Sequence, residues 1–206
     1  MEQARIAELD PAVIEKARRG DTGAFALIVQ RYQGPVYNLA YRMLGNSADA
    51  EDAAQETFLR VYAQLKSYHP NQKFATWLLS IAAHYCIDRL RRRKFQWLSL
   101  DEEGGIGQVL PSSTPDPEET AFEHEREEQV QKLLQRLPPA ARAVVVLKYW
   151  SDLGVDEIAA MTGDSVSSVK VKLFRARQAM ARELKQQAPD AVRKGKGLER
   201  AVSHAR

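Results

Sequence analysis

The segment Phe74–Lys94, FATWLLSIAAHYCIDRLRRRK, is the best guide to the fold of this chain. Placed on a helix at about 100° per residue, its apolar side chains cover more than half of the circumference, which is typical of a helix buried among other helices. The remaining polar stripe holds Trp77, and the helix ends in Arg89, Arg92 and Arg93. An exposed indole beside a basic helix end favours stacking of bases and binding of phosphates. The alternative is that Trp77 packs under a neighbouring loop and that the arginines only solvate and cap the helix end.

The composition predicts an all-α protein of one large or two small domains. The 206 residues are 44% hydrophobic and 28% charged, and Ala, Leu, Arg, Glu and Gln abound. The single cysteine, Cys86, excludes an internal disulfide framework and indicates a reducing compartment. The N-terminus lacks the apolar segment of a signal peptide, and no apolar run approaches membrane-spanning length. We therefore expect a cytoplasmic protein without membrane insertion.

The charge distribution says more than the net charge of +3. Ten acidic side chains lie between Ser99 and Glu128 against a single Arg126, so the two flanking regions are basic. Because a polyanion needs cationic faces rather than a cationic average, basic lobes joined by an acidic segment indicate binding to nucleic acid. We expect the linker to hold the two lobes apart, so that they contact separate patches of one duplex.

Start and stop signals predict four helices before residue 98, enough for one compact domain. Asp10-Pro11 starts the first, Asp21 caps the second, and Ser47 caps the third. Gly34-Pro35 is expected to break or kink the second helix. The loop Tyr68–Lys73 then precedes the Phe74–Lys94 helix.

The second half of the chain begins with a linker and continues as a second helical domain. Gly, Pro and Ser crowd into Ser99–Pro117, which predicts an extended and mobile segment. Ala143–Tyr149 is apolar enough for a strand, but its length and helical neighbours favour a buried helix. A long helix from Ser165 to about Gln187 precedes a basic tail that we expect to be frayed. The predicted boundaries are 1–98 for the first domain, 99–128 for the acidic linker, 129–187 for the second domain and 188–206 for the tail.

The segment Val155–Arg175 has the pattern of a DNA-reading helix-turn-helix. Gly163 suits the tight turn, and Ser165 caps the second helix. One face of that helix is an apolar stripe: Val166, Val169, Leu173, Ala176, Met180 and Leu184. The outward face joins carbon-rich side chains suited to thymine methyls with cations and hydroxyls for guanines and phosphates: Ser167, Ser168, Lys170, Val171, Lys172, Phe174, Arg175, Gln178 and Arg182. The alternative is a helical hairpin that packs on the first domain through Phe174.

Three blocks taken together resemble one known family. They are AEDAAQETFLRVYAQLKSY (Ala50–Tyr68), the Phe74–Lys94 helix, and LPPAARAVVVLKYWSDLGVDEIAAMTGDSVSSVKVKLFRARQAM (Leu137–Met180). In this order across an acidic linker, they resemble alternative bacterial sigma factors of the extracytoplasmic-function type, which have only the sigma-2 and sigma-4 domains. The family commonly has Gly-Thr where this chain has Ser167 and Ser168, so its −35 preference is expected to differ from that of close relatives.

The resemblance implies promoter-specific transcription initiation with core RNA polymerase and promoter DNA as partners. It implies that the sigma-2 domain docks on the polymerase β′ coiled coil through Asp52, Gln55, Glu56, Leu59 and Tyr62, and that the β flap is a further contact. It implies −10 recognition by the Tyr68–Lys73 loop and the adjacent helix, through Tyr68, His69, Asn71, Lys73, Trp77, Arg89, Arg92 and Arg93. The helix-turn-helix would read the −35 element through Ser167, Ser168, Lys170, Val171, Lys172, Phe174, Arg175 and Gln178. An anti-sigma factor is a partner that family habit alone implies.

Two other classes of function are alternatives: a free-standing regulator and an enzyme. A free-standing helix-turn-helix regulator would need a dimer surface or a ligand pocket, whereas the first domain instead offers an aromatic and basic helix. For an enzyme, His84, Cys86 and Asp88 are the only suggestive cluster. Cys86 points away from His84 on a helix, and His84 and Asp88 more simply form a hydrogen bond one turn apart. We therefore predict no catalytic residue, no metal and no cofactor.

Overall fold

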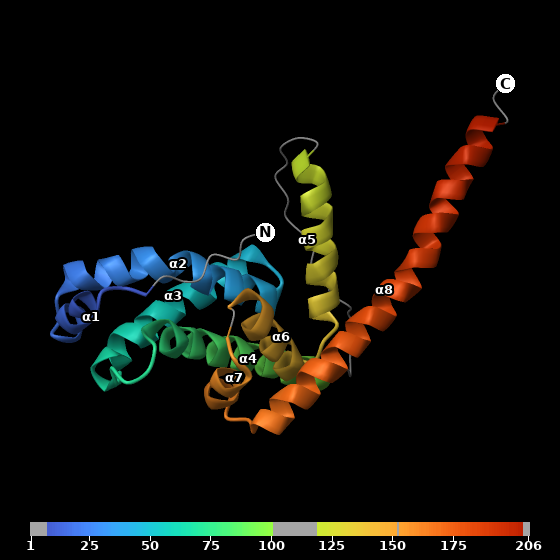
Figure 1. Ribbon diagram of the computed structural model, residues 1–206. Coiled ribbons are helices and arrows are strands. Elements are labelled where there is room, and N and C mark those ends of the chain that lie inside the picture. Colours follow the sequence, from blue (N-terminus) through green and yellow to red (C-terminus); the bar gives the residue numbers. More distant parts are fainter. Residues whose placement is uncertain (1–7, 101–118, 152, 204–206) are drawn as a thin grey trace.

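A computed structural model describes residues 8–100, 119–151 and 153–203 of the chain. Within these ranges the protein contains eight α-helices and no strand, which confirms the all-α prediction (Figure 1). The helices form two lobes, α1 to α4 and α5 to α8, as the predicted two-part architecture requires. None of the helices in these ranges has the length and hydropathy that a membrane span needs.

The first lobe is built from α1 (Pro11–Arg18), α2 (Thr22–Leu44), α3 (Ser47–Gln64), a short 3₁₀ turn (Leu65–Ser67) and α4 (Phe74–Leu100). The predicted caps of the first two helices are confirmed. An oxygen of Asp10 accepts a bond from the Ala12 N–H at 2.8 Å, and one of Asp21 accepts from the Ala24 N–H at 3.0 Å.

Two details of the first lobe differ from the prediction. Helix α2 runs through Pro35, so the expected break, one of the two predicted outcomes, does not occur. Tyr32 and Val36 on either side of the proline are fully buried, and their packing outweighs the lost backbone bond. The cap of α3 is Asn46 rather than Ser47. Gly45 ends α2 in the left-handed region (φ 92°), which leaves Asn46 extended, and its side-chain oxygen accepts from the Asp49 N–H at 2.8 Å.

The second lobe contains α5 (Glu119–Gln135), α6 (Pro139–Trp150), α7 (Val155–Thr162) and α8 (Val166–Ser203). Ala143–Tyr149 lies in α6 as predicted, with Val144 and Val146 fully buried. The prediction that the segment after residue 187 is frayed was wrong up to Ser203, because the backbone of α8 continues that far. Good helix formers dominate this segment, and extending an established helix costs little.

The segment between the end of α4 and the start of α5 is shorter than the predicted linker of residues 99–128. Helix α4 reaches Leu100 and α5 begins at Glu119, so both ends of the 99–128 segment are helical. The extended and mobile part of the prediction falls on residues 101–118, which lie outside the described residues.

The two lobes pack on each other instead of standing apart. One continuous apolar core runs from Ile14 in α1 to Ala176 in α8, and α6 contacts both α2 and α4 while α7 contacts α4. Figure 1 shows α6 and α7 lying beside α4, with the far end of α8 projecting away from the body. The expectation of separated lobes was therefore wrong for this structure, because apolar side chains of both lobes are buried together.

A buried arginine joins the lobes at the carboxyl end of α2. Arg142 of α6 donates to the Met43 carbonyl oxygen and to the Gln135 side-chain oxygen, both at 2.5 Å. It also donates to the Gln135 carbonyl at 2.7 Å and the Leu137 carbonyl at 3.2 Å. Burial lowers the pKa of Arg142 to about 10, so the guanidinium stays charged at neutral pH. Its positive charge faces the carbonyl end of a helix, where a cation is favourable.

Two further contacts join the lobes at the last turn of α2. The Gln131 side-chain amide donates to the Tyr41 carbonyl at 2.9 Å, and the Arg42 guanidinium lies over the Trp150 ring with 4.5 Å to its centroid. Gly45 has a positive φ of 92°, which favours glycine there, and a Cβ at this position would lie 2.8 Å from the end of the Gln135 side chain and push it away.

Candidate nucleic-acid interface

The turn between α7 and α8 has the geometry of a helix-turn-helix. Gly163 ends α7 in the left-handed region (φ 68°), and the N–H of Asp164 donates to the Ala159 carbonyl at 3.1 Å. The Ser165 hydroxyl accepts from the Ser168 N–H at 3.2 Å, which confirms the predicted cap of the second helix. Ile158 and Ala159 are buried, as predicted, where the two helices cross.

The outward side of α8 is exposed as predicted. Val171 is 46% and Phe174 is 55% exposed, whereas Val169, Leu173 and Ala176 on the same helix are buried. We call the exposed set on this side the recognition face. It consists of Ser167, Lys170, Val171, Phe174, Arg175 and Gln178. Arg175 does not turn inward against protein, so the hairpin alternative, in which Phe174 packs on the first lobe, is not what the structure shows.

The predicted apolar stripe of α8 is confirmed up to Met180 and wrong for Leu184. Val166 and Met180 are half-buried against the core, whereas Leu184 is 43% exposed. The adjacent Glu183 pairs with Arg136, just after α5, so this turn of α8 still meets the second lobe while the Leu184 side chain stays in solvent.

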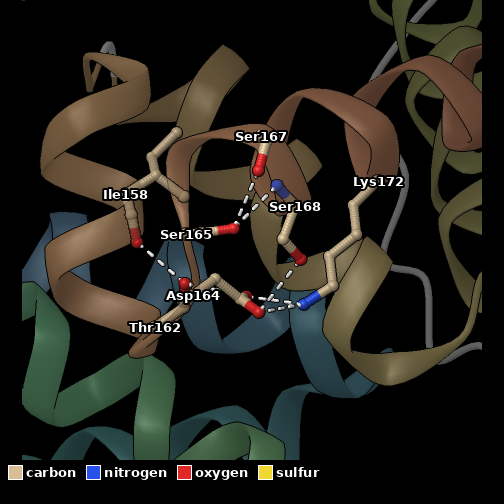
Figure 2. A network of polar contacts seen from close by, with 7 residues as sticks. All are labelled: Ile158, Thr162, Asp164, Ser165, Ser167, Ser168 and Lys172. Atoms are coloured by element: carbon tan, nitrogen blue, oxygen red, sulfur yellow. Dashed lines mark hydrogen bonds and ion pairs between the residues drawn. The ribbon is translucent and has the colours of Figure 1, made fainter.

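Two predicted DNA contacts, Ser168 and Lys172, are engaged by an acid that sequence reasoning missed. Both oxygens of Asp164 lie near the Lys172 ammonium, at 2.6 and 2.5 Å, and the Ser168 hydroxyl donates to Asp164 at 3.3 Å (Figure 2). The bond from Lys172 is the main reason that the pKa of Asp164 is lowered. The sequence feature that could have predicted this pair is an acid in the turn, directly before a helix whose lysine side chains point back toward its N-terminus.

Tyr68, predicted to contact the −10 element, is buried and is therefore a structural residue here. Its ring meets Phe74 edge-on at 5.1 Å between centroids, and its hydroxyl donates to the Gln72 carbonyl at 2.7 Å. A ring in this position cannot stack on a base, because both its apolar body and its polar end already have partners.

Trp77 is half-buried rather than exposed. Its ring centroid lies 5.3 Å from that of Tyr68 and 5.6 Å from that of Phe74. The prediction of a free indole was wrong, and the alternative of packing near the loop accounts for most of the side chain. The neighbouring loop supplies an apolar surface that helical periodicity within α4 does not reveal.

The rest of the loop is exposed, with one contact to the other lobe. His69, Asn71 and Lys73 are all exposed. The Lys73 ammonium lies 3.2 Å from a carboxylate oxygen of Glu157, which belongs to α7. The bond from the Gly154 N–H, followed by this contact, lowers the pKa of Glu157. The loop therefore touches the helix-turn-helix directly.

The basic end of α4 is only partly open. Arg89 is paired with Asp49 and also lies 3.4 Å from Asp52, so its charge is used to hold α4 against α3. The prediction that Arg89 binds DNA phosphates conflicts with this pairing. Arg92 is exposed, and the side chain of Arg93 lies outside the described residues.

The residues predicted to dock on polymerase form one side of α3. Asp52, Gln55, Leu59 and Tyr62 are exposed, and Leu59 is 67% exposed with no apolar role in the first lobe. Glu56 is half-buried and pairs with Arg60 at 2.8 Å. An acidic and apolar strip of this kind suits a partner that offers both cations and carbon.

The cluster weighed for an enzyme is divided between two environments. Cys86 is buried, and burial raises the pKa of its thiol to about 12, whereas His84 and Asp88 are exposed. Among the residues that the structure describes, no three His, Cys, Asp or Glu side chains are grouped as a metal ion would require.

Comparison with known proteins places these two lobes in one family. The pattern described as Sigma-70 region 2 matches residues 28–96, and Sigma-70, region 4 matches residues 127–180. The ECF RNA polymerase sigma factor SigW of Bacillus subtilis (strain 168) is 37% identical over 177 residues, covering 84% of this chain and 95% of SigW. The ECF RNA polymerase sigma-E factor of Escherichia coli (strain K12) is 30% identical over 176 residues, covering 83% and 92%.

A solved structure shows the same fold. The sigma factor RpoE from Bartonella quintana, determined with the anti-sigma factor NepR, matches with a TM-score of 0.60 at 20% identity, covering 78% of this chain and 96% of RpoE. With both lobes matched in order by relatives of nearly the same extent, the chain belongs to the ECF group of sigma-70 RNA polymerase sigma factors.

Proposed function

We propose that this sigma factor binds core RNA polymerase and directs it to promoters whose −35 element is read by α8 and whose −10 element is handled by the first lobe. Members of its family are transcription initiation factors rather than enzymes. The observation that carries the proposal is the recognition face. Val171 and Phe174 stay exposed on the second helix of a helix-turn-helix, beside Arg175. Exposed carbon there suits thymine methyls, and the cations suit guanine edges and phosphates.

In the first lobe, the groups available to DNA are His69, Asn71, Lys73 and Arg92, which are exposed. Unstacking a base costs a few kcal/mol, which contacts from an open loop and from phosphate-binding cations offset. Trp77 packs against Tyr68 and Phe74 and so supports the loop, and only the exposed part of its ring is available to contact DNA.

The two lobes must separate for this role. Lys73 is paired with Glu157, and α7 lies on α4, so the packed arrangement blocks part of the loop from DNA. We propose that polymerase, bound through the exposed strip of α3, holds the lobes at separate sites. When two weakly binding lobes are held on one enzyme, binding of the first raises the effective concentration of the second at its DNA element, so the overall affinity for the promoter exceeds that of either lobe alone.

An anti-sigma factor is the further partner that we propose. The RpoE structure contains such a factor, and its fold is shared by this chain. A protein that binds the two lobes in their packed arrangement would keep the Tyr68–Lys73 loop paired with α7 and would prevent the two lobes from reaching separate DNA elements.

Run-off transcription on a promoter library with purified core polymerase tests the function. We expect the chain to co-elute with core polymerase in gel filtration and to produce transcripts from a subset of templates that share two separated elements. Failure to co-elute, combined with binding of a palindromic duplex as a dimer, would instead identify a free-standing regulator.

A further inference from the structure

Asp164 occupies an unusual position for an acid on a DNA-reading element. It lies in the turn, directly before the N-terminus of α8, where phosphates are bound by backbone N–H groups and nearby cations. Its carboxylate is surrounded by donors from its own chain, as Figure 2 shows. The Lys172 ammonium lies at 2.6 and 2.5 Å from its two oxygens, and the Ser168 hydroxyl at 3.3 Å from one of them.

The geometry makes this contact a stable pair rather than a passing one. The side chains of Lys172 and Asp164 are only 29% and 23% exposed, so water screens the pair incompletely. The Thr162 hydroxyl, itself 2.9 Å from the Ile158 carbonyl, lies 3.0 Å from the same carboxylate and helps to orient it. To reach a phosphate, Lys172 would have to leave both carboxylate oxygens.

We propose that Asp164 sets the duplex affinity of α8 by standing in for a phosphate: it keeps Lys172 and Ser168 engaged, so that these two residues add nothing net to DNA binding. The proposal rests on the proposed function, and it removes Lys172 and Ser168 from the predicted −35 contacts. The recognition face remains to read sequence.

The consequence is that α8 binds DNA of any sequence with lower affinity than it would if Lys172 were free. One cation that releases one counterion contributes about eightfold to affinity at 0.1 M salt, with a salt slope of about −0.9 per phosphate contact. With that contribution cancelled, α8 alone binds unrelated duplexes weakly, and productive binding depends more on the recognition face and on polymerase.

The chain offers a matched control for this inference. Lys170 lies on the same helix, is exposed, and belongs to the recognition face. If Lys172 is cancelled by Asp164 and Lys170 is not, removing the two lysines has different consequences once Asp164 is neutralised as well.

The test measures binding of the complex between the full chain and core polymerase to a promoter duplex over a series of KCl concentrations. Asp164→Asn is expected to bind about eightfold more tightly at 0.1 M salt, with a salt slope steeper by about one. Lys172→Met alone leaves the carboxylate unpaired and is expected to weaken binding.

The double variant Asp164→Asn/Lys172→Met is expected to bind within about twofold of the unchanged chain, with the same slope. Lys170→Met is expected to lose about eightfold and to flatten the slope by about one.

Two results would overturn the inference. If the double variant loses as much affinity as Lys170→Met, Lys172 contacts phosphate in the complex and Asp164 does not cancel it. If Asp164→Asn changes only the melting temperature and leaves the salt slope unchanged, Asp164 is merely structural. Arg175→Ala separates this question from the proposed function: an unchanged affinity there defeats the proposed function and this inference together, whereas a loss there combined with a weak double variant defeats this inference alone.

Discussion

The recognition face of α8 and the Tyr68–Trp77 region were both predicted to contact DNA, yet they differ in what their side chains do in the folded chain. Phe174 and Arg175 are exposed on α8, whereas Tyr68 is buried and Trp77 is half-buried against Phe74. In the recognition face, apolar surface is left over after folding is complete. In the Tyr68–Trp77 region, aromatic surface contributes to the core. An aromatic residue therefore indicates a binding site only where its own fold leaves it uncovered.

The largest expected effect comes from Trp77→Ala. Removing an indole packed on two rings is expected to lower the free energy of unfolding by roughly 2–3 kcal/mol. Phe174→Ala removes a smaller aromatic ring from an exposed position and is expected to change stability by less than about 0.5 kcal/mol. Denaturant unfolding of both variants measures the contrast, and equal losses would show that the two regions do not differ in the way described.

Arg142→Met tests whether the lobes are held together by the buried guanidinium. The carbonyls of Met43 and Gln135 would lose a donor, so we expect about 2 kcal/mol of lost stability and a larger distance between labels on α2 and α6. Arg136→Met is the matched control, because Arg136 pairs with Glu183 at a position where its side chain is 61% exposed. An equal effect of the two variants would remove Arg142 from its role between the lobes.

Arg175→Ala is expected to act on DNA alone. Binding of the polymerase complex to the promoter should weaken by about 1.5 kcal/mol, roughly tenfold, and dependence on the −35 sequence should fall. The melting temperature should not change, since the guanidinium is exposed. Arg177→Ala, an exposed arginine on the same helix outside the recognition face, should alter affinity without altering the sequence preference. Footprints that are unchanged by Arg175→Ala would refute the assignment of the recognition face.

Glu157→Gln is expected to have the smallest effect, because the pair with Lys73 is partly exposed and worth about 0.5 kcal/mol. The pKa of Glu157 is lowered from 4.5 by the Gly154 N–H and then by Lys73. Its contribution to stability is therefore fully present above pH 4.5 and is lost as the pH falls through the lowered, folded-state value. A stability profile from pH 6 to pH 3 should show a shallower fall for the glutamine variant. Identical profiles would mean that the contact contributes nothing.

The same comparison explains how far the sequence could predict this structure. The turn at Gly163, the cap at Ser165 and the apolar spacing along α8 as far as Met180 are local signals, and each was confirmed. The ion-pair partners of Lys73 and Arg89 were missed because they are distant in sequence: Glu157 is 84 positions from Lys73, and Asp49 is 40 positions from Arg89. Helical periodicity shows that such residues share a polar side, and it contains no information on which element covers that side. The packing of the lobes was missed for the same reason.

The most direct test of the account is photo-crosslinking from two exposed positions, 71 in the loop and 174 on α8, within the complex of the chain, core polymerase and promoter DNA. We predict that position 174 labels double-stranded DNA upstream and that position 71 labels a separated strand downstream in the same complex. Labelling of one shared DNA segment by both positions, or of protein alone by position 174, would contradict the claim that two lobes read two elements.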